Sequence, residues 1–145
     1  MRRMVLAGIA FLGGLSAVVA ADDPIATRKA LMKANGDATK VVVPMLKGEA
    51  PFKLEAVQAA LTAYADSAGK MGRLFPKGSE TGGKTEALPA IWTNKADFDA
   101  KMAKFGEDSK AALASIKDEA SFKANFGGVL KNCGGCHETY RAKPK

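Results

Sequence analysis

Cys133, Cys136 and His137 are the residues of this 145-residue chain best suited to chemistry, and they lie within five consecutive positions. They form the segment CGGCH, eight residues before the C-terminus, and the chain has no other cysteine or histidine. Two thiols at this spacing can each add to one vinyl group of a haem, and the histidine that follows can then reach the iron. The motif predicts one covalently attached haem c, with Cys133 and Cys136 as thioether donors and His137 as the proximal iron ligand.

Three other interpretations of these residues stay open from the motif alone. A dithiol–disulfide redox pair usually occurs in a βαβ unit, and it leaves the histidine without a role. A structural disulfide that closes so short a loop would stabilise the fold little. A zinc site would need a fourth ligand with a nitrogen or sulfur donor, and the sequence offers no further cysteine or histidine.

Four amphipathic helices are expected around the motif, at about 24–47, 51–72, 93–116 and 118–144. Asp23 before Pro24 is typical of a helix start, and Pro44 predicts a kink or an early end of the first helix. Residues 73–92 show no periodicity and predict a long loop. In the second helix the apolar residues repeat at alternating spacings of three and four: Leu54, Val57, Leu61, Tyr64, Ala68 and Met71. Because each helix has one stripe to bury, we expect an all-α antiparallel four-helix bundle.

Residues 1–21 are predicted to be a cleaved signal peptide, which leaves a mature domain at 22–145. Arg2 and Arg3 precede an apolar stretch that small residues close. The alternative is an uncleaved membrane anchor, but two glycines and a serine interrupt a stretch that is already short. The prediction implies an exported, periplasmic protein without a membrane segment after cleavage.

The chain is basic, with 22 Lys and Arg against 15 Asp and Glu and a formal net charge of +7. Removing two arginines with residues 1–21 leaves 7 − 2 = +5. The lysines are spread along the chain and no basic-aromatic motif is present, so nucleic acid is not the expected partner. The lysines are either solvated helix faces or a docking surface for an acidic redox protein.

The chain resembles the cytochrome c′ family, the class II cytochromes c, over its whole mature length. The matching segments are TRKALMKANG at 27–36, PAIWTNKADFDAKMAKF at 89–105 and CGGCHETYR at 133–141. Cytochrome c′ is itself an established example of the four-helix bundle. The resemblance implies that a residue four positions after Arg28, which is Met32, faces the haem iron opposite His137.

Met32 decides between two functions that the resemblance implies. The low-spin cytochrome c-556 type has methionine there as the sixth iron ligand, whereas high-spin cytochromes c′ have an apolar side chain that does not bind iron. Met32 therefore predicts a low-spin, one-electron carrier that is not an enzyme. The alternative is a five-coordinate cytochrome c′ that binds NO or CO, with Met32 as pocket lining. From periodicity alone Met32 is an ordinary core residue, and Met45, Met71 and Met102 compete with it for the iron.

Three further residues are expected in the haem environment by the same resemblance. Arg28 is either a cation for a haem propionate or a solvated helix residue. Trp92 either reaches a propionate through its indole N–H or packs between the long loop and the third helix. Arg141 lies four residues after His137 and is expected to shape the proximal pocket. The resemblance leaves the oligomeric state as monomer or homodimer, and the redox partner open.

Overall fold

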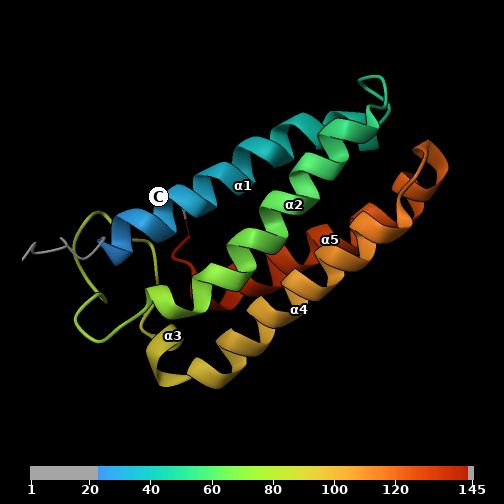
Figure 1. The fold of residues 1–145 in the computed structure, drawn as a ribbon. Coiled ribbons are helices and arrows are strands. Elements are labelled where there is room, and N and C mark those ends of the chain that lie inside the picture. Colours follow the sequence, from blue (N-terminus) through green and yellow to red (C-terminus); the bar gives the residue numbers. More distant parts are fainter. Residues whose placement is uncertain (1–22, 144–145) are drawn as a thin grey trace, which may run out of the picture.

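A computed structural model describes residues 23–143, and the long helices in this part of the chain form an antiparallel bundle (Figure 1). They are α1 (Pro24–Leu46), α2 (Leu54–Met71), α4 (Lys95–Ser115) and α5 (Glu119–Tyr140). Helices that follow one another along the chain pack together, and the α2–α4 contact is the most extensive. α1 and α5 touch each other little, which leaves one side of the bundle less tightly closed. The predicted all-α four-helix bundle is confirmed.

The first helix begins as the sequence predicted. The carboxylate of Asp23 accepts a hydrogen bond of 2.8 Å from the backbone N–H two residues on. Pro44 lies inside α1, which continues to Leu46, close to the expected end at about residue 47. Pro44 has no N–H to donate to the carbonyl four residues earlier, so it removes one helix hydrogen bond close to the end of α1. α1 stops two residues later, and Gly48 then turns the chain with a φ of 76°.

The fourth long helix starts with a reciprocal pair of capping hydrogen bonds. The Asp118 side chain accepts from the backbone N–H of Ser121 at 2.8 Å, and the Ser121 hydroxyl accepts from the backbone N–H of Asp118 at 3.1 Å. α5 ends at Tyr140, earlier than the predicted end at about 144. Residues 1–22 lie outside the described part of the chain, so the predicted signal peptide is untested.

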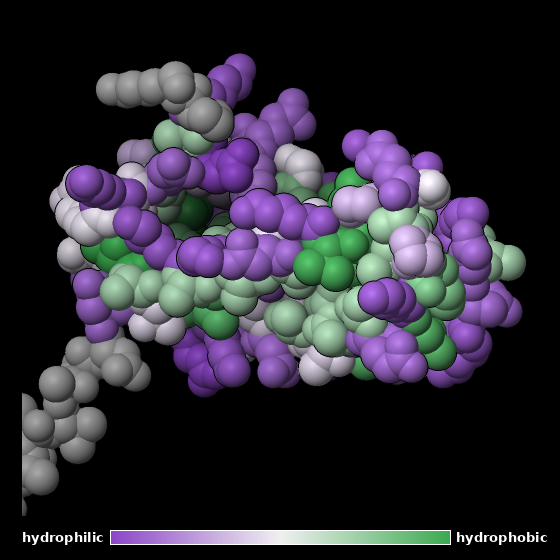
Figure 2. All heavy atoms as spheres, turned by 90° about the horizontal axis from the view of Figure 1, so that it is seen from above, coloured by the Kyte–Doolittle hydropathy of each residue, from purple (hydrophilic) through white to green (hydrophobic). Residues whose placement is uncertain are grey.

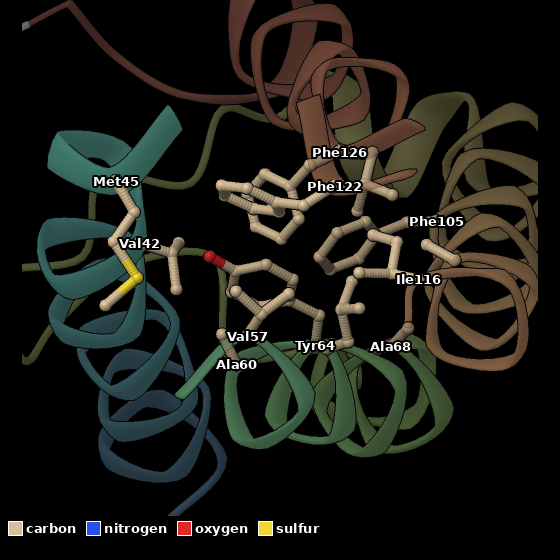
Figure 3. Packing of buried hydrophobic residues seen from close by; sticks show 13 residues of the cluster. Val42, Met45, Val57, Ala60, Tyr64, Ala68, Phe105, Ile116, Phe122 and Phe126 are labelled. Carbon is tan, nitrogen blue, oxygen red and sulfur yellow. The ribbon is translucent and has the colours of Figure 1, made fainter. Parts of the chain in front are cut away.

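The core consists of two clusters at opposite ends of the bundle. In Figure 3, side chains of the first cluster point from α1, α2, α4 and α5 toward a common centre. Tyr64 lies there with its ring centre 5.6 Å from that of Phe105 and 6.3 Å from that of Phe126. The second cluster lies at the end that carries the CGGCH segment, and its buried members are Met71, Phe75, Ile91, Phe98, Met102, Cys136 and Tyr140.

The long connection between α2 and α4 is more structured than the sequence suggested. It begins with a 3-10 turn, η1 (Gly72–Leu74), and ends with the short helix α3 (Ala90–Thr93), where the sequence predicted only a loop. Between them, residues 75–89 form a loop that crosses the end of the bundle where both described ends of the chain lie (Figure 1). The loop pairs with the end of α5, because the backbone N–H of Leu88 donates to the Tyr140 carbonyl at 3.0 Å. Within residues 23–143, no helix is both long and apolar enough to cross a membrane.

Candidate haem site

A cavity of about 620 Å³ opens at the loosely closed side of the bundle and contains the residues of the CGGCH segment. Its walls come from α1 and α5, its floor from α2 and α4, and one end from the 75–89 loop. Figure 2 shows a recess with a hydrophobic floor and hydrophilic side chains around its rim. The apolar lining comprises Met32, Met71, Phe75, Ile91, Phe98, Met102, Phe105 and Leu130. A volume of this size suits a cofactor rather than a bound ion.

Cys133, Cys136 and His137 all face this cavity from the last two turns of α5. A regular helix places residues three and four apart on the same side, so it brings the two sulfurs and the imidazole to one surface. Cys136 is buried, whereas Cys133 and His137 are half-buried. The two thiols are free. The local helix alone therefore brings together the three groups that the motif predicts to attach the haem and bind its iron.

Burial sets the protonation of these groups. It raises the pKa of Cys136 to about 11 and also raises the pKa of Cys133 above its ordinary value. Thiol–disulfide exchange requires a thiolate, which such an environment disfavours, so the dithiol redox interpretation is not supported. Burial, helped by the nearby Arg141 cation, lowers the pKa of His137. A neutral imidazole is the form that binds iron.

The opposite wall is formed by α1, which presents one continuous face to the cavity. Met32, Asn35, Gly36 and Thr39 line it at helical spacings of three and four. Met32 is half-buried and packs against the second cluster. A β-carbon at Gly36 would meet no atom within 4 Å, so its side of the helix faces open space. The amide oxygen of Asn35 is buried without a hydrogen-bond partner, while its amide nitrogen donates to Ser67 Oγ at 2.6 Å.

Arg28 lines the cavity but is not a solvated helix residue, because only 4% of it is exposed. Its guanidinium donates four hydrogen bonds, all of them to η1 and the loop that follows. The acceptors are the Leu74 carbonyl, the hydroxyl and the carbonyl of Ser79, and the Thr85 hydroxyl. Burial lowers the pKa of Arg28, and the carboxylates of Asp23 and Glu80 oppose this shift.

Trp92 and Arg141 differ in their relation to the cavity, because Arg141 lines it and Trp92 does not. Trp92 is absent from the cavity lining, and its indole N–H donates to the Pro76 carbonyl at 3.1 Å. Its ring meets that of Phe75 edge-on, with centres 5.5 Å apart. This placement matches the interpretation of Trp92 as a packing residue between the loop and the next helix. Arg141 is exposed, lines the cavity, and caps α5 with a backbone hydrogen bond of 3.1 Å to the His137 carbonyl.

Comparison with known proteins identifies the family. The family model described as Cytochrome C' matches residues 23–141. This chain belongs to the cytochrome c′ family. It is 52% identical over 143 residues to a cytochrome c′ of Rhodopseudomonas palustris, which covers 99% of this chain and 97% of the relative. It is also 41% identical over 117 residues to a cytochrome c-556 of Agrobacterium tumefaciens, covering 80% of this chain and 94% of the relative.

Solved structures of both kinds of relative have the same fold. A cytochrome c′ from R. palustris superposes with a TM-score of 0.83 at 53% identity, over 86% of this chain and all of that one. An NMR-validated structural model of oxidised R. palustris cytochrome c556 superposes with a TM-score of 0.77 at 33% identity, over the same shares. The cytochrome c′ family resemblance noted in the sequence is confirmed.

The residues around the cavity fit haem c, the cofactor of this cytochrome family. The floor is apolar, and α5 offers two thiols and an imidazole on one surface. Gly36 leaves room for a flat group close to the backbone of α1. Lys29, Lys84 and Arg141 give the rim positive charges that suit carboxylates. Among residues 23–143, no three His, Cys, Asp or Glu side chains gather as a purely protein-built metal site would require.

Proposed function

We propose that this cytochrome is a periplasmic one-electron carrier whose haem iron is held by His137 on one side and Met32 on the other. The observation that carries the proposal is the position of Met32. Its side chain lines the haem cavity from α1, whereas His137 lines it from α5. The low-spin members of the family have methionine at the position that Met32 matches, which supports the same assignment.

The other methionines are less suited to bind the iron. Met45 belongs to the first core cluster and does not line the cavity. Met71 and Met102 line it, but they are 1% and 6% exposed and pack in the floor on α2 and α4. Met32 is half-buried, so its thioether is less committed to packing. A thioether is a soft ligand that favours the reduced iron and raises the haem potential.

A site with both axial positions filled by the protein suits electron transfer. The same two ligands serve both oxidation states, so little has to reorganise when one electron arrives or leaves. The chain has one histidine, and His137 is the proximal ligand, so no side chain pairs with an imidazole base for hydrolytic chemistry. We therefore propose electron transfer rather than enzymatic turnover.

A five-coordinate cytochrome that binds NO or CO is the second candidate. The observation in its favour is that the relative at 52% identity is named cytochrome c′, whereas a relative named cytochrome c-556 is 41% identical. In that case Met32 would line the pocket without binding the iron. The two candidates differ in whether a small ligand can reach the iron, and this is directly measurable.

The first test is the visible spectrum of the haem-loaded protein, oxidised and reduced, with and without CO. A weak far-red methionine–iron band in the oxidised protein and no change with CO would support His137–Met32 ligation. A reduced spectrum that shifts with CO would contradict it and favour gas binding. Met32→Leu should abolish the far-red band and admit CO. The matched control Met71→Leu changes another cavity methionine and should keep the wild-type spectrum.

Export and partner choice are part of the same proposal. We propose that residues 1–21 are removed on export and that the mature domain meets acidic redox proteins through its positive charge. Lys29, Lys84 and Arg141 lie at the cavity rim, where an electron would have the shortest path. Reduction rates with an acidic partner should fall as salt is added, because screening weakens the attraction. Reduction rates that do not change with ionic strength would argue against this docking surface. The choice between monomer and homodimer stays a prediction.

A further inference from the structure

Arg28 occupies an unusual place for a charged residue, at the junction of α1 and the 75–89 loop. Four hydrogen bonds of 2.7 to 3.0 Å join its guanidinium to acceptors spread over Leu74, Ser79 and Thr85. Nη1 donates to Leu74 and to the Ser79 hydroxyl, and Nη2 donates to the Ser79 carbonyl and to the Thr85 hydroxyl. A planar fork of donors suits such a set of acceptors, and a lysine ammonium does not. Arg28 therefore fixes the loop to α1.

A second set of contacts fixes the same loop to α5. The backbone N–H of Leu88 donates to the Tyr140 carbonyl at 3.0 Å, and the N–H of Ala142 donates to the Glu86 carbonyl at 2.8 Å. The loop thus connects the helix of Met32 with the helix of His137. Direct packing between α1 and α5 is slight, so the loop provides a further connection between the two walls at this end.

A chain of contacting aromatic rings also connects Arg28 with α5. The guanidinium carbon lies 4.5 Å from the centre of the Phe75 ring. Phe75 meets Phe98 edge-on at 4.8 Å, and Phe98 meets Tyr140 edge-on at 5.3 Å. Tyr140 is one helical turn beyond Cys136 and His137. The position of Arg28 is therefore coupled by direct contacts to the turn of α5 that carries the proximal ligand.

We propose that Arg28 is a positioning residue for the sixth iron ligand. Its hydrogen bonds to the 75–89 loop hold α1 at the distance from α5 at which Met32 reaches the iron. Arg28 lies one helical turn before Met32 on the same face of α1, so a shift of this turn moves the thioether directly. This inference rests on the proposed Met32 ligation. It differs from the expectation that Arg28 serves a haem propionate, because its donors are directed to the loop.

The test compares Arg28→Gln and Arg28→Lys with wild type in the haem-loaded protein. Two readouts are needed: the far-red methionine–iron band with CO binding, and the rate of trypsin cleavage after Lys77 and Lys84 in the loop. For Arg28→Gln we expect weakened ligation, CO binding, and cleavage faster by about tenfold or more, since losing one charged hydrogen bond already corresponds to about that factor. Arg28→Lys should behave like Arg28→Gln, because it keeps the charge but not the fork. Lys33→Gln is the control, since Lys33 is on the same helix and its side chain is 77% exposed.

Each outcome has a definite meaning. If wild type itself binds CO and lacks the far-red band, the proposed function and this inference both fail. If wild type is six-coordinate and Arg28→Gln keeps that ligation, only the positioning role is refuted, whatever happens to loop cleavage. If Arg28→Lys keeps the wild-type ligation, the charge of Arg28 rather than the geometry of its hydrogen bonds positions Met32, and the inference is wrong.

A second variant covers the case in which Arg28→Gln does not accumulate. Ser79→Ala removes one acceptor hydroxyl and leaves the buried guanidinium three partners, so the bundle should still fold. We expect faster loop cleavage and partial CO binding from it, in the same direction as Arg28→Gln but smaller. Wild-type behaviour of Ser79→Ala in both readouts would overturn the proposal.

Discussion

The hydrogen bond between Thr39 and Tyr64 predicts a strongly asymmetric pair of substitutions. The two hydroxyl oxygens are 2.7 Å apart, and the Thr39 hydroxyl also donates to the Asn35 carbonyl at 2.7 Å. The Thr39 hydroxyl has one hydrogen, which it donates to the Asn35 carbonyl. The Tyr64 hydroxyl must therefore be the donor to the Thr39 oxygen. Tyr64 is fully buried in the first cluster, whereas Thr39 is half-buried at the cavity edge.

Removing the acceptor, the Thr39 hydroxyl, should lower the free energy of unfolding more than removing the donor, the Tyr64 hydroxyl. Thr39→Val keeps the shape of the side chain but leaves the buried Tyr64 hydroxyl without this partner, which costs about 1–3 kcal/mol. Tyr64→Phe removes the buried hydroxyl itself, and Thr39 keeps its bond to the Asn35 carbonyl, so the cost is about 0.5–1 kcal/mol. The double variant should therefore be no less stable than Thr39→Val alone, with a coupling energy at least as large as the Tyr64→Phe cost of about 0.5–1 kcal/mol.

Urea unfolding of the haem-loaded protein, followed by far-UV circular dichroism, measures these differences. The slope of free energy against urea should stay constant across the four proteins, so that midpoints report stability. A Tyr64→Phe variant that is less stable than Thr39→Val would refute the assigned direction of the hydrogen bonds. Strictly additive effects would show that the two hydroxyls do not interact.

Three further outcomes are expected. Replacing both Cys133 and Cys136 by alanine should abolish covalent haem attachment, as judged by haem stain on a denaturing gel. Either single variant should keep one thioether bond. Haem retained by the double variant would contradict the predicted attachment sites. Phe126→Ala should cost about 3–5 kcal/mol in urea unfolding, since the ring is fully buried, yet leave the visible spectrum unchanged because it does not line the cavity. The hydrogen bond of 2.5 Å from the Tyr140 hydroxyl to Asp97 is the main cause that raises the pKa of Tyr140 to about 12. This bond therefore stabilises the fold fully below pH 10, and its contribution is lost as the pH rises toward 12. The difference in the free energy of unfolding between wild type and Tyr140→Phe should therefore decrease from pH 9 to 11.5. A difference that stays constant or grows would contradict this role of the hydrogen bond.

The helices and the attachment motif could be predicted because both depend on local sequence. The stripe of α2 repeats at helical spacing, and Val57, Leu61 and Tyr64 are completely buried as that repeat requires. The cap at Asp118 depends on residues within one turn, so the sequence contains the whole signal. The CGGCH segment needs no tertiary partner to bring its three groups to one side of a helix.

The loop and the role of Arg28 could not be predicted because they depend on distant residues. Arg28 binds Ser79 and Thr85, which are 51 and 57 positions away, and no periodic pattern connects them. A glycine such as Gly36 weakens an isolated helix, but here it lies on the cavity face, where a missing side chain leaves room for the cofactor. The short α3 contains one buried residue, Ile91, which is too weak a signal for periodicity to detect.

The division of the core explains why one sequence can hold both a stable bundle and a large cavity. At one end, the rings of Phe122, Phe126 and Tyr64 close the space between all four helices. At the other end α1 and α5 stay apart, and packing between them is replaced by the cofactor and by the 75–89 loop. A cavity lined by apolar side chains loses the contacts that would otherwise stabilise it. The covalent haem restores those contacts, so the same attachment that supplies the redox centre also completes the core.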